Sequence, residues 1–322
     1  MMDQVDVSVV IPTYNHENYI EQCIKSVCMQ KVNFNLEVIV GEDCSKDKTR
    51  EVLKRLEPAL PPYFQILYRE NNLCDGNFSD LFLRMRGRYF IILEGDDFWT
   101  YEYKLQKEYD FLESHPDYTA VAHNAQVVNE FGKPIKWRCH ECYNTEYTIW
   151  DFRKGLFPGQ TATVLRRNFY AYDLYEHNID IPGYPGDRIK AFFAVANGKV
   201  HCFQEKWSAY RLVISHGSSA AATSKRLYDK DLIFYRSLYE YAIRNQLPKD
   251  VRIVTEELYM WFLFTCLLKH RCELNRQKFI KIYSDMKYKT RCGGYIVTRL
   301  LYMPIEKIKY KKENKLKLEA AT

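Results

Sequence analysis

Short apolar runs alternate with amphipathic stretches along the first hundred residues. Each run has the length and the β-branched composition of a strand that is covered on both faces. The four runs are Val7–Ile11, Leu36–Val40, Phe64–Tyr68 and Tyr89–Leu93. Between them, apolar residues recur at helical spacing after Tyr19, over Thr49–Leu56 and over Phe78–Met85. This alternation predicts right-handed βαβ units and a mostly parallel sheet.

The rest of the chain changes from a mixed to a helical pattern. Residues 125–180 are rich in aromatic and charged residues and have no clear period. Around them, helical patterns cover Lys104–Leu112 and Asp187–Ala196, and strand patterns cover Tyr118–His123 and Val200–Phe203. Later helical patterns cover Leu227–Asn245, Lys249–His270 and Gln277–Tyr288. We therefore expect an α/β domain over residues 1–224 and a helical C-terminal region over residues 225–322.

Charge and hydropathy exclude several classes of protein. No apolar run approaches the roughly 18 residues of a membrane span, and the N-terminus lacks a signal-peptide pattern, so we expect a cytoplasmic protein. The net charge of +6 is uneven: from Cys266 onward there are 15 Lys/Arg against 5 Asp/Glu, which leaves −4 for the rest. This is not the charge pattern of a nucleic-acid-binding protein. The one C-x-x-C, Cys139–Cys142, lacks a second pair for a zinc site.

Three acidic residues follow the fourth apolar run, where a strand should end. They are Glu94, Asp96 and Asp97, with Gly95 between them. Ligand sites in open α/β sheets lie outside the carboxyl ends of the strands. Clustered carboxylates repel one another unless a cation compensates them, and their hard oxygens suit Mg²⁺ or Mn²⁺ shared with phosphates. The alternative is an acidic turn that caps the next helix.

Two earlier strand ends carry polar residues as well. Pro12–Asn15 follows the first strand without a glycine-rich loop, which argues against a dinucleotide fold and a P-loop. Tyr14 offers an aromatic face to a base, whereas Asn15 suits either a hydrogen bond to a ligand or a helix cap. Asp43 follows the second strand and suits a base N–H, a ribose hydroxyl or an Asx turn before Thr49.

The ordered set of segments resembles the family 2 glycosyltransferases over roughly residues 5–220. The segments are VSVVIPTYNHENYI, EVIVGEDCSKDKT, a strand leading to EGDDFW, and KLQKEYDFLESHPDY. The resemblance implies a GT-A fold, with a mostly parallel central sheet flanked by helices. It also implies a nucleotide-binding half over residues 1–100 and an acceptor half over residues 101–224.

The resemblance further implies a set of site residues. The nucleotide-sugar would contact Pro12, Thr13, Tyr14, Asp43, Asn77, Glu94, Asp96 and Arg211, with Asp43 reading the base. The commoner family forms of two segments are DDGS and DxDD, whereas this chain has EDCS and EGDD. We favour Asp96 and Asp97 as metal ligands, joined by His216, with Glu94 near the ribose or outside the metal's ligands.

Asp187 is the candidate general base. It lies in Pro185-Gly186-Asp187-Arg188, just before a helix and upstream of Tyr210-Arg211, where the family places such an acid. A carboxylate there would take the proton from the acceptor hydroxyl in an inverting transfer. The alternative is a helix cap paired with Arg188.

The expected function is transfer of a sugar from a nucleotide-sugar to a glycan or lipid-linked glycan in surface polysaccharide synthesis, with Mn²⁺ or Mg²⁺. The alternatives are a sugar-nucleotide nucleotidyltransferase, or a glycan-binding relative without turnover. Six lysines over residues 307–317 suit a peripheral contact with the inner face of a membrane, or a solvated tail.

Overall fold

The computed structural model describes residues 4–136, 141–168, 186–213, 228–268 and 276–301. The chain divides into two compact units. The first unit comprises Met1–Thr148, Leu156–Glu176 and Gly198–Val213, and the second comprises Ile149–Gly155, His177–Asn197 and Ile214–Thr322. The helix predicted at 187–196 belongs to the second unit, with the C-terminal helices. The domain boundary after residue 224 stays a prediction.

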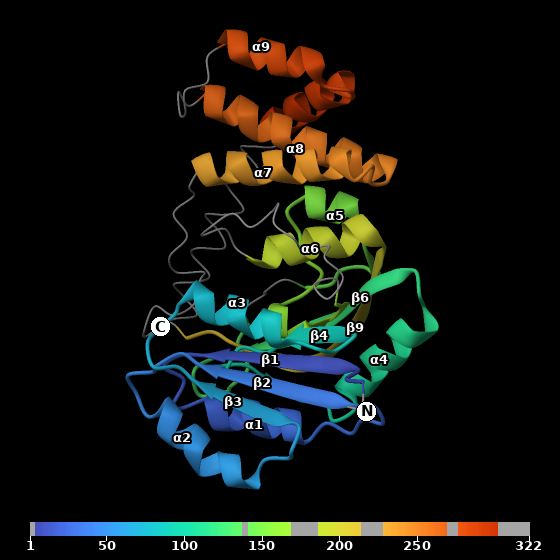
Figure 1. The fold of residues 1–322 in the computed structure, drawn as a ribbon. Helices are drawn as coiled ribbons and strands as arrows, with labels where there is room; N and C mark the ends of the chain where they lie inside the picture. The colour runs from blue at the N-terminus through green and yellow to red at the C-terminus, as the bar shows by residue number, and fades with distance from the viewer. Residues whose placement is uncertain (1–3, 137–140, 169–185, 214–227, 269–275, 302–322) are drawn as a thin grey trace. The chain divides into compact units, whose positions relative to one another are not determined.

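The first unit is built on a nine-stranded sheet (Figure 1). Its main path runs β3-β2-β1-β4-β8-β6-β9-β5, and β7 pairs with β9. The pairs β1–β2, β1–β4, β2–β3 and β6–β9 are parallel. The strands are β1 Val7–Thr13, β2 Leu36–Glu42, β3 Phe64–Tyr68, β4 Tyr89–Ile92, β5 Phe98–Trp99, β6 Tyr118–Val128, β7 Glu146–Tyr147, β8 Val164–Arg167 and β9 Lys199–Arg211.

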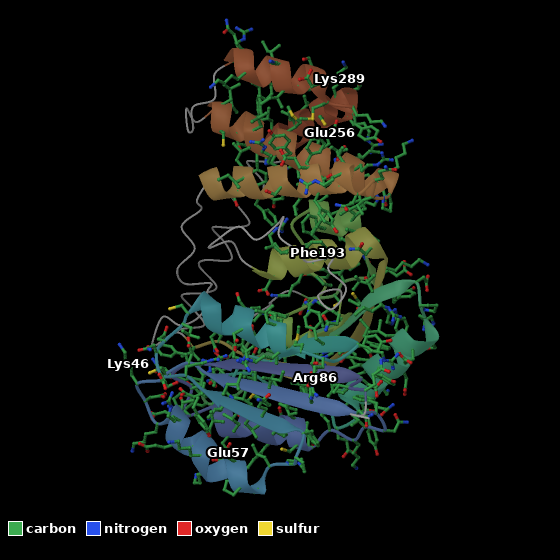
Figure 2. The ribbon with its side chains drawn as sticks, in the orientation of Figure 1. Lys46, Glu57, Arg86, Phe193, Glu256 and Lys289 are labelled. Carbon is green, nitrogen blue, oxygen red and sulfur yellow. The ribbon has the colours of Figure 1, made fainter. Side chains whose placement is uncertain are left out.

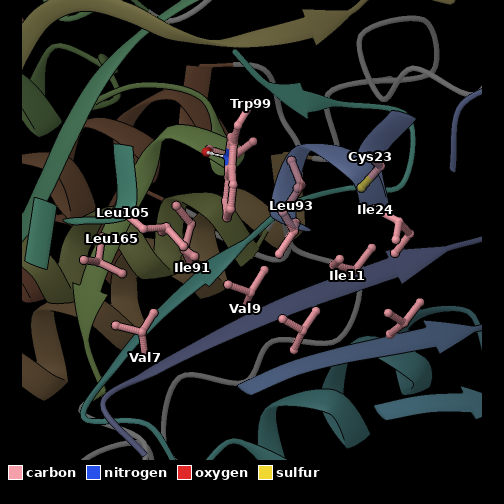
Figure 3. Close-up of a cluster of buried hydrophobic side chains, with 14 of the residues drawn as sticks. Val7, Val9, Ile11, Cys23, Ile24, Ile91, Leu93, Trp99, Leu105 and Leu165 are labelled. Atoms are coloured by element: carbon pink, nitrogen blue, oxygen red, sulfur yellow. Dashed lines mark hydrogen bonds between the residues drawn. The ribbon is translucent and has the colours of Figure 1, made fainter. Parts of the chain in front are cut away.

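Helices cover both faces of this sheet. They are α1 Ile20–Cys28, α2 Thr49–Leu56, α3 Asp75–Arg84 and α4 Lys104–Ser114. One face packs on α1, α2 and α4 through a core that includes Val9, Ile91 and Leu105 (Figure 3). The opposite face packs on α3, where Leu81 meets Val10. Burial on both faces explains the unbroken apolar runs of the strands.

The α/β fold with its mostly parallel sheet is confirmed, although β1, β2, β4, β6 and β9 end at other residues than the sequence predicted. β1 does not stop before Pro12 but continues to Thr13, and the Pro12 carbonyl accepts a hydrogen bond from the Gly95 N–H (3.1 Å). Pro12 lacks an N–H, yet its carbonyl still has a partner. β9 continues past Phe203 to Arg211, because the polar residues 204–206 interrupt its apolar pattern without ending the strand.

The second unit is helical in its described part. Its helices are α5 Ile149–Arg153, α6 Gly186–Asn197, α7 Tyr228–Arg244, α8 Lys249–Leu268 and α9 Arg276–Asp285, followed by a helix over residues 289–301. α7 packs on α8 with the rings of Tyr235 and Phe262 stacked 4.2 Å apart. The helix predicted over 277–288 is confirmed as α9 but ends at Asp285. A turn separates it from the next helix, and the Glu256 carboxylate accepts the Tyr288 N–H of that turn (2.5 Å). Among the described helices, none has the length and hydropathy needed to cross a bilayer.

Candidate functional site

The polar strand ends expected from the sequence meet at one edge of the sheet. β1 lies between β2 and β4, and both pairings are parallel, so their carboxyl ends point the same way. Thr13 pairs with Glu42 at this edge, and the acidic loop 94–97 begins just after β4. Pro12–Asn15, Glu42-Asp43 and Glu94–Asp97 therefore lie next to one another where the strands end and their loops begin.

Gly95 brings the acidic loop against the end of β1. A Cβ atom on Gly95 would lie 2.6 Å from Thr13 Oγ1 and 2.7 Å from His16 Nδ1. Both distances are shorter than any carbon side chain tolerates. Only glycine fits at this position. The close approach of Gly95 to Thr13 places the flanking acids next to the end of β1.

Asp96 keeps its carboxylate turned toward this edge. The side chain is 22% exposed, and its Oδ2 lies 3.9 Å from His16 Nε2. Within the described ranges, no N–H or O–H group donates a hydrogen bond to this carboxylate. Asp96 therefore has oxygen atoms available for a ligand.

His16 is a site residue that the sequence analysis missed. Its Nδ1 lies 3.1 Å from Thr13 Oγ1, a hydrogen bond that orients the ring with Nε2 toward Asp96. Burial lowers the pKa of His16, although the nearby Asp96 opposes this shift. A neutral imidazole leaves the Asp96 charge uncompensated. The available signal was its position three residues after Thr13, which is the spacing of one turn.

Asp97 points the other way and is buried, with 3% of the residue exposed. Its Oδ1 accepts a hydrogen bond from the Arg211 backbone N–H (2.7 Å). Burial raises the pKa of Asp97 well above its usual value, and the charges of Asp96 and Glu94 raise it further. Asp97 thus fastens the acidic loop to β9, and its role as a metal ligand stays a prediction.

The Arg211 side chain also holds this loop. Its guanidinium donates hydrogen bonds to the backbone carbonyls of Asp96 (2.8 Å) and Glu130 (3.0 Å) and to Gln22 Oε1 (2.7 Å). The group lies over the Tyr19 ring, 4.6 Å from its centroid. These contacts tie β9, α1 and the loop together. The expected contact of Arg211 with the nucleotide-sugar stays a prediction.

The acids after β2 are bound by the chain itself. The two Asp43 carboxylate oxygens accept the N–H groups of Leu73 (2.8 Å) and Cys74 (3.0 Å). The Glu42 carboxylate accepts the Ser45 N–H and pairs with Arg50 at 2.6 Å. Asp43 therefore orders the segment before α3, and its reading of a base stays a prediction.

Asn77 and Asn15 support this second loop. Asn77 is 3% exposed; its Nδ2 donates to the Gly41 carbonyl and its Oδ1 accepts from Arg69 Nε, both at 3.0 Å. Asn15 Oδ1 accepts the Lys46 N–H (2.9 Å), so Asn15 joins the first two loops, whereas the N-cap of α1 is Tyr19. Tyr14, between Thr13 and Asn15, is half-buried. Contact of Asn77 and Tyr14 with a nucleotide-sugar stays a prediction.

Three predicted residues remain, Asp187, His216 and Glu94. Asp187 is in the first turn of α6, in the second unit; its side chain is 51% exposed and lies 3.2 Å from Lys190 Nζ. Its role as a base stays a prediction. His216 lies outside the described residues. Glu94 is half-buried at the start of the acidic loop.

A divalent cation fits Asp96 as a partial site. The described part of the chain contains no group of three or more His, Cys, Asp or Glu side chains arranged to hold a metal ion. Mg²⁺ and Mn²⁺ commonly take one or two carboxylates and complete their ligands with substrate phosphates and water. The partly exposed Asp96 suits that arrangement, and burial lowers the pKa of the neighbouring His16, which disfavours a competing positive charge there.

Comparison with known proteins identifies the class. The profile of "Glycosyl transferase family 2" matches residues 8–172, which is half of the chain. The protein belongs to this family, as the sequence motifs indicated.

Two relatives match about two fifths of the chain. An uncharacterised protein of Mycobacterium tuberculosis is 33% identical over 139 residues, 41% of this chain and 40% of that protein. The putative teichuronic acid biosynthesis glycosyltransferase TuaG of Bacillus subtilis is 30% identical over 131 residues, 39% of this chain and 51% of TuaG. The chain thus spans about half or less of the length of these relatives.

A solved structure with the same fold covers more of the chain. S. aureus TarS 1–349 in complex with UDP-GlcNAc is similar with a TM-score of 0.58 and 17% identity, over 87% of this chain and 80% of that chain. At this identity the similarity concerns the fold. It confirms the expected GT-A-like architecture.

Proposed function

We propose that the protein transfers a sugar from a nucleoside diphosphate sugar to a hydroxyl group of a glycan or lipid-linked glycan, during surface polysaccharide synthesis. The observation that carries the proposal is the open carboxylate of Asp96 at the meeting point of three strand-end loops. Family membership, the UDP-GlcNAc complex of TarS and the putative role of TuaG in teichuronic acid biosynthesis support it.

The loops after β1 and β2 would bind the nucleoside. Pro12, Thr13 and Tyr14 would line its pocket. The Asp43 carboxylate would accept one further hydrogen bond, from an N–H of the base. The backbone N–H groups of Leu73 and Cys74 fix the Asp43 carboxylate in place. A carboxylate oxygen can accept more than one hydrogen bond, so these contacts leave room for a ligand N–H.

Asp96 would hold the metal next to the diphosphate. A divalent cation, Mn²⁺ or Mg²⁺, offsets the negative charge that develops on a leaving diphosphate. Asp97 and Arg211 keep Asp96 in position through the hydrogen bonds across β9. His16 orients toward the same carboxylate from the β1 side.

Asp187 would act as general base for the acceptor hydroxyl. Its exposed carboxylate at the start of α6 is accessible to a large acceptor. Asp187 would take the proton of the acceptor hydroxyl. The acceptor oxygen would bond to the sugar carbon on the face opposite the diphosphate, whose bond to that carbon breaks, and this displacement inverts the carbon. This assignment rests on the resemblance of Pro185–Arg188 to the family pattern.

Two alternatives are less well supported. A sugar-nucleotide nucleotidyltransferase would carry a glycine-rich basic loop after β1, and this chain has Pro-Thr-Tyr-Asn there. A glycan-binding relative without turnover would be expected to lose an acid, and Asp43, Asp96, Asp97 and Asp187 are all present.

A donor screen tests the proposal. Release of nucleoside diphosphate would be measured for a panel of nucleotide-sugars with Mn²⁺, with Mg²⁺ or with EDTA. We expect one donor class to be turned over and EDTA to abolish turnover. No turnover of any donor would contradict the proposed reaction, and turnover unaffected by EDTA would contradict the metal role of Asp96.

A further inference from the structure

A helical hairpin ends the described part of the second unit. α9 and the helix over residues 289–301 are joined by a tight turn, in which the Tyr283 hydroxyl donates to the Lys289 carbonyl (2.9 Å). The Glu256 carboxylate of α8 fixes the turn through the Tyr288 N–H (Glu256 and Lys289 are labelled in Figure 2). We call residues 276–301 the terminal hairpin.

One side of the terminal hairpin is packed against α8. The Tyr295 ring lies 6.5 Å from the Trp261 ring, and the Arg299 guanidinium lies 5.3 Å from it. Cys292 and Ile296 are also buried. These buried residues account for the packing of the terminal hairpin on α8.

Further apolar side chains of the hairpin face solvent. Leu301 is 72% exposed, Val297 58% and Ile280 54%. Val297 and Leu301 are four residues apart, so they lie on the same side of their helix. A surface helix of a soluble protein ordinarily carries polar residues on that side. These side chains are unexplained by packing within the described residues.

The terminal hairpin is also strongly basic. Its 26 residues include seven Lys/Arg and one acid, Asp285, so this segment alone carries +6. Lys287, Lys289 and Arg291 are exposed. Exposed apolar residues and lysines in one helical segment are the pattern of helices that lie in the interface of an anionic membrane.

We infer that the terminal hairpin binds an anionic lipid surface, with Val297 and Leu301 entering the headgroup layer and Lys287 and Lys289 contacting lipid phosphates. The positive charge of the terminal hairpin would suit a soluble polyanion as well as a lipid surface. The exposed apolar side chains favour lipid, because a soluble polyanion offers nothing to cover them. This inference concerns the second unit and does not depend on the proposed transfer reaction.

Vesicle sedimentation of the full chain tests the inference. We expect binding to vesicles of phosphatidylcholine mixed with phosphatidylglycerol, weaker binding as salt rises, and little binding to phosphatidylcholine alone. The double variant Val297→Ser/Leu301→Ser should lower partitioning roughly tenfold or more. Its control, Leu83→Ser, removes an 87% exposed leucine from the first unit and should bind as the unchanged chain does.

A charge-reversal variant gives the second test. Lys287→Glu/Lys289→Glu should lower partitioning roughly tenfold or more, because each lysine near such a surface contributes on the order of 1 kcal/mol. Lys54→Glu/Lys133→Glu makes the same change of net charge on the first unit and should have little effect. Release of nucleoside diphosphate in solution should be unchanged in all these variants, so a failure of the donor screen leaves the lipid result interpretable.

Three outcomes would overturn the inference. Unchanged binding by both hairpin variants would place lipid contact outside the terminal hairpin. Loss in the charge variant with full binding by Val297→Ser/Leu301→Ser would indicate a site for soluble polyanions. An equal loss in the two control variants would show that net charge or general surface hydrophobicity, and not the hairpin, determines binding.

Discussion

Two acidic loops follow neighbouring strands of the sheet, and they use their carboxylates differently. After β2, Asp43 accepts two backbone N–H groups from residues 73 and 74. After β4, Asp97 accepts one N–H from β9, while Asp96 keeps its carboxylate half-exposed beside His16. The same sequence pattern, acids at the end of a strand, thus builds a loop whose carboxylate is bound by backbone N–H groups in one place and leaves a partly exposed carboxylate in the other. The difference arises from hydrogen-bond donors distant in the sequence, since N–H groups of residues 73, 74 and 211 reach Asp43 and Asp97 but not Asp96.

The largest expected effect is on activity, and it concerns Asp96, whose carboxylate is partly exposed, in contrast to the hydrogen-bonded Asp43 and Asp97. Asp96→Asn removes the charge that would hold a cation, and we expect nucleoside diphosphate release to fall about 10²–10³-fold, as for loss of one transition-state stabilising group. Stability should change by no more than about 0.5 kcal/mol, because the carboxylate makes no hydrogen bond within the described residues.

The matched control is Asp117→Asn, which alters a surface ion pair with Lys199 (2.9 Å). It should leave turnover unchanged. Normal turnover by Asp96→Asn would contradict the proposed metal role of Asp96 and leave the acidic loop after β4 with an architectural role.

The next effect should appear in stability. Asp43→Ala leaves the Leu73 N–H without its acceptor and the Cys74 N–H with Asn72 Oδ1 alone (3.1 Å), and we expect the free energy of unfolding to fall by about 1–3 kcal/mol. Chemical denaturation measures this change. Asp96→Ala is the comparison, and an equal loss of stability in the two variants would erase the distinction between the loops.

Gly95→Ala tests how tightly the open loop is seated. The added Cβ would displace Thr13 or His16, so we expect a loss of about 1–3 kcal/mol in the free energy of unfolding. Gly76→Ala is the control, since its Cβ would meet only the Leu73 Cβ at an ordinary 3.5 Å. Thermal melting of the two variants measures this difference. Equal melting temperatures would show that the chain around Gly95, Thr13 and His16 can accommodate a Cβ atom.

The smallest effect concerns the backbone of the bound loop. Cys44 has φ +57°, a left-handed conformation that glycine adopts without penalty, and the commoner form of this segment has glycine there. Cys44→Gly should raise the free energy of unfolding by about 1 kcal/mol. Cys44→Ala retains the Cβ and should give no gain; a gain of equal size would attribute the effect to the sulfur atom.

The sequence predicted the parts of this site that depend on local pattern. The strands at Val7, Leu36 and Tyr89 are regular apolar runs, and the position of the acids after them follows from the rule for ligand sites in open sheets. Family motifs then supplied the residue roles, and the family and fold are confirmed.

Contacts between distant segments could not be predicted in this way. Nothing local to Asp43 and Asp97 shows that the first meets residues 73 and 74 and the second meets residue 211. The neighbouring His16 was missed because its role comes from a hydrogen bond and a burial that only the folded chain creates. The break after α9 depends likewise on Glu256, about 30 residues earlier.

The hydrogen bond from the Arg211 amide to Asp97 provides a single-residue reporter of the site. This amide proton is bound by a side chain of the acidic loop and not by a neighbouring strand. Its solvent exchange rate and its nitrogen chemical shift therefore depend on whether that loop stays seated. In a spectrum of the ¹⁵N-labelled protein, the Arg211 amide resonance would therefore shift when a ligand binds to the acidic loop. The ligand itself would need no label.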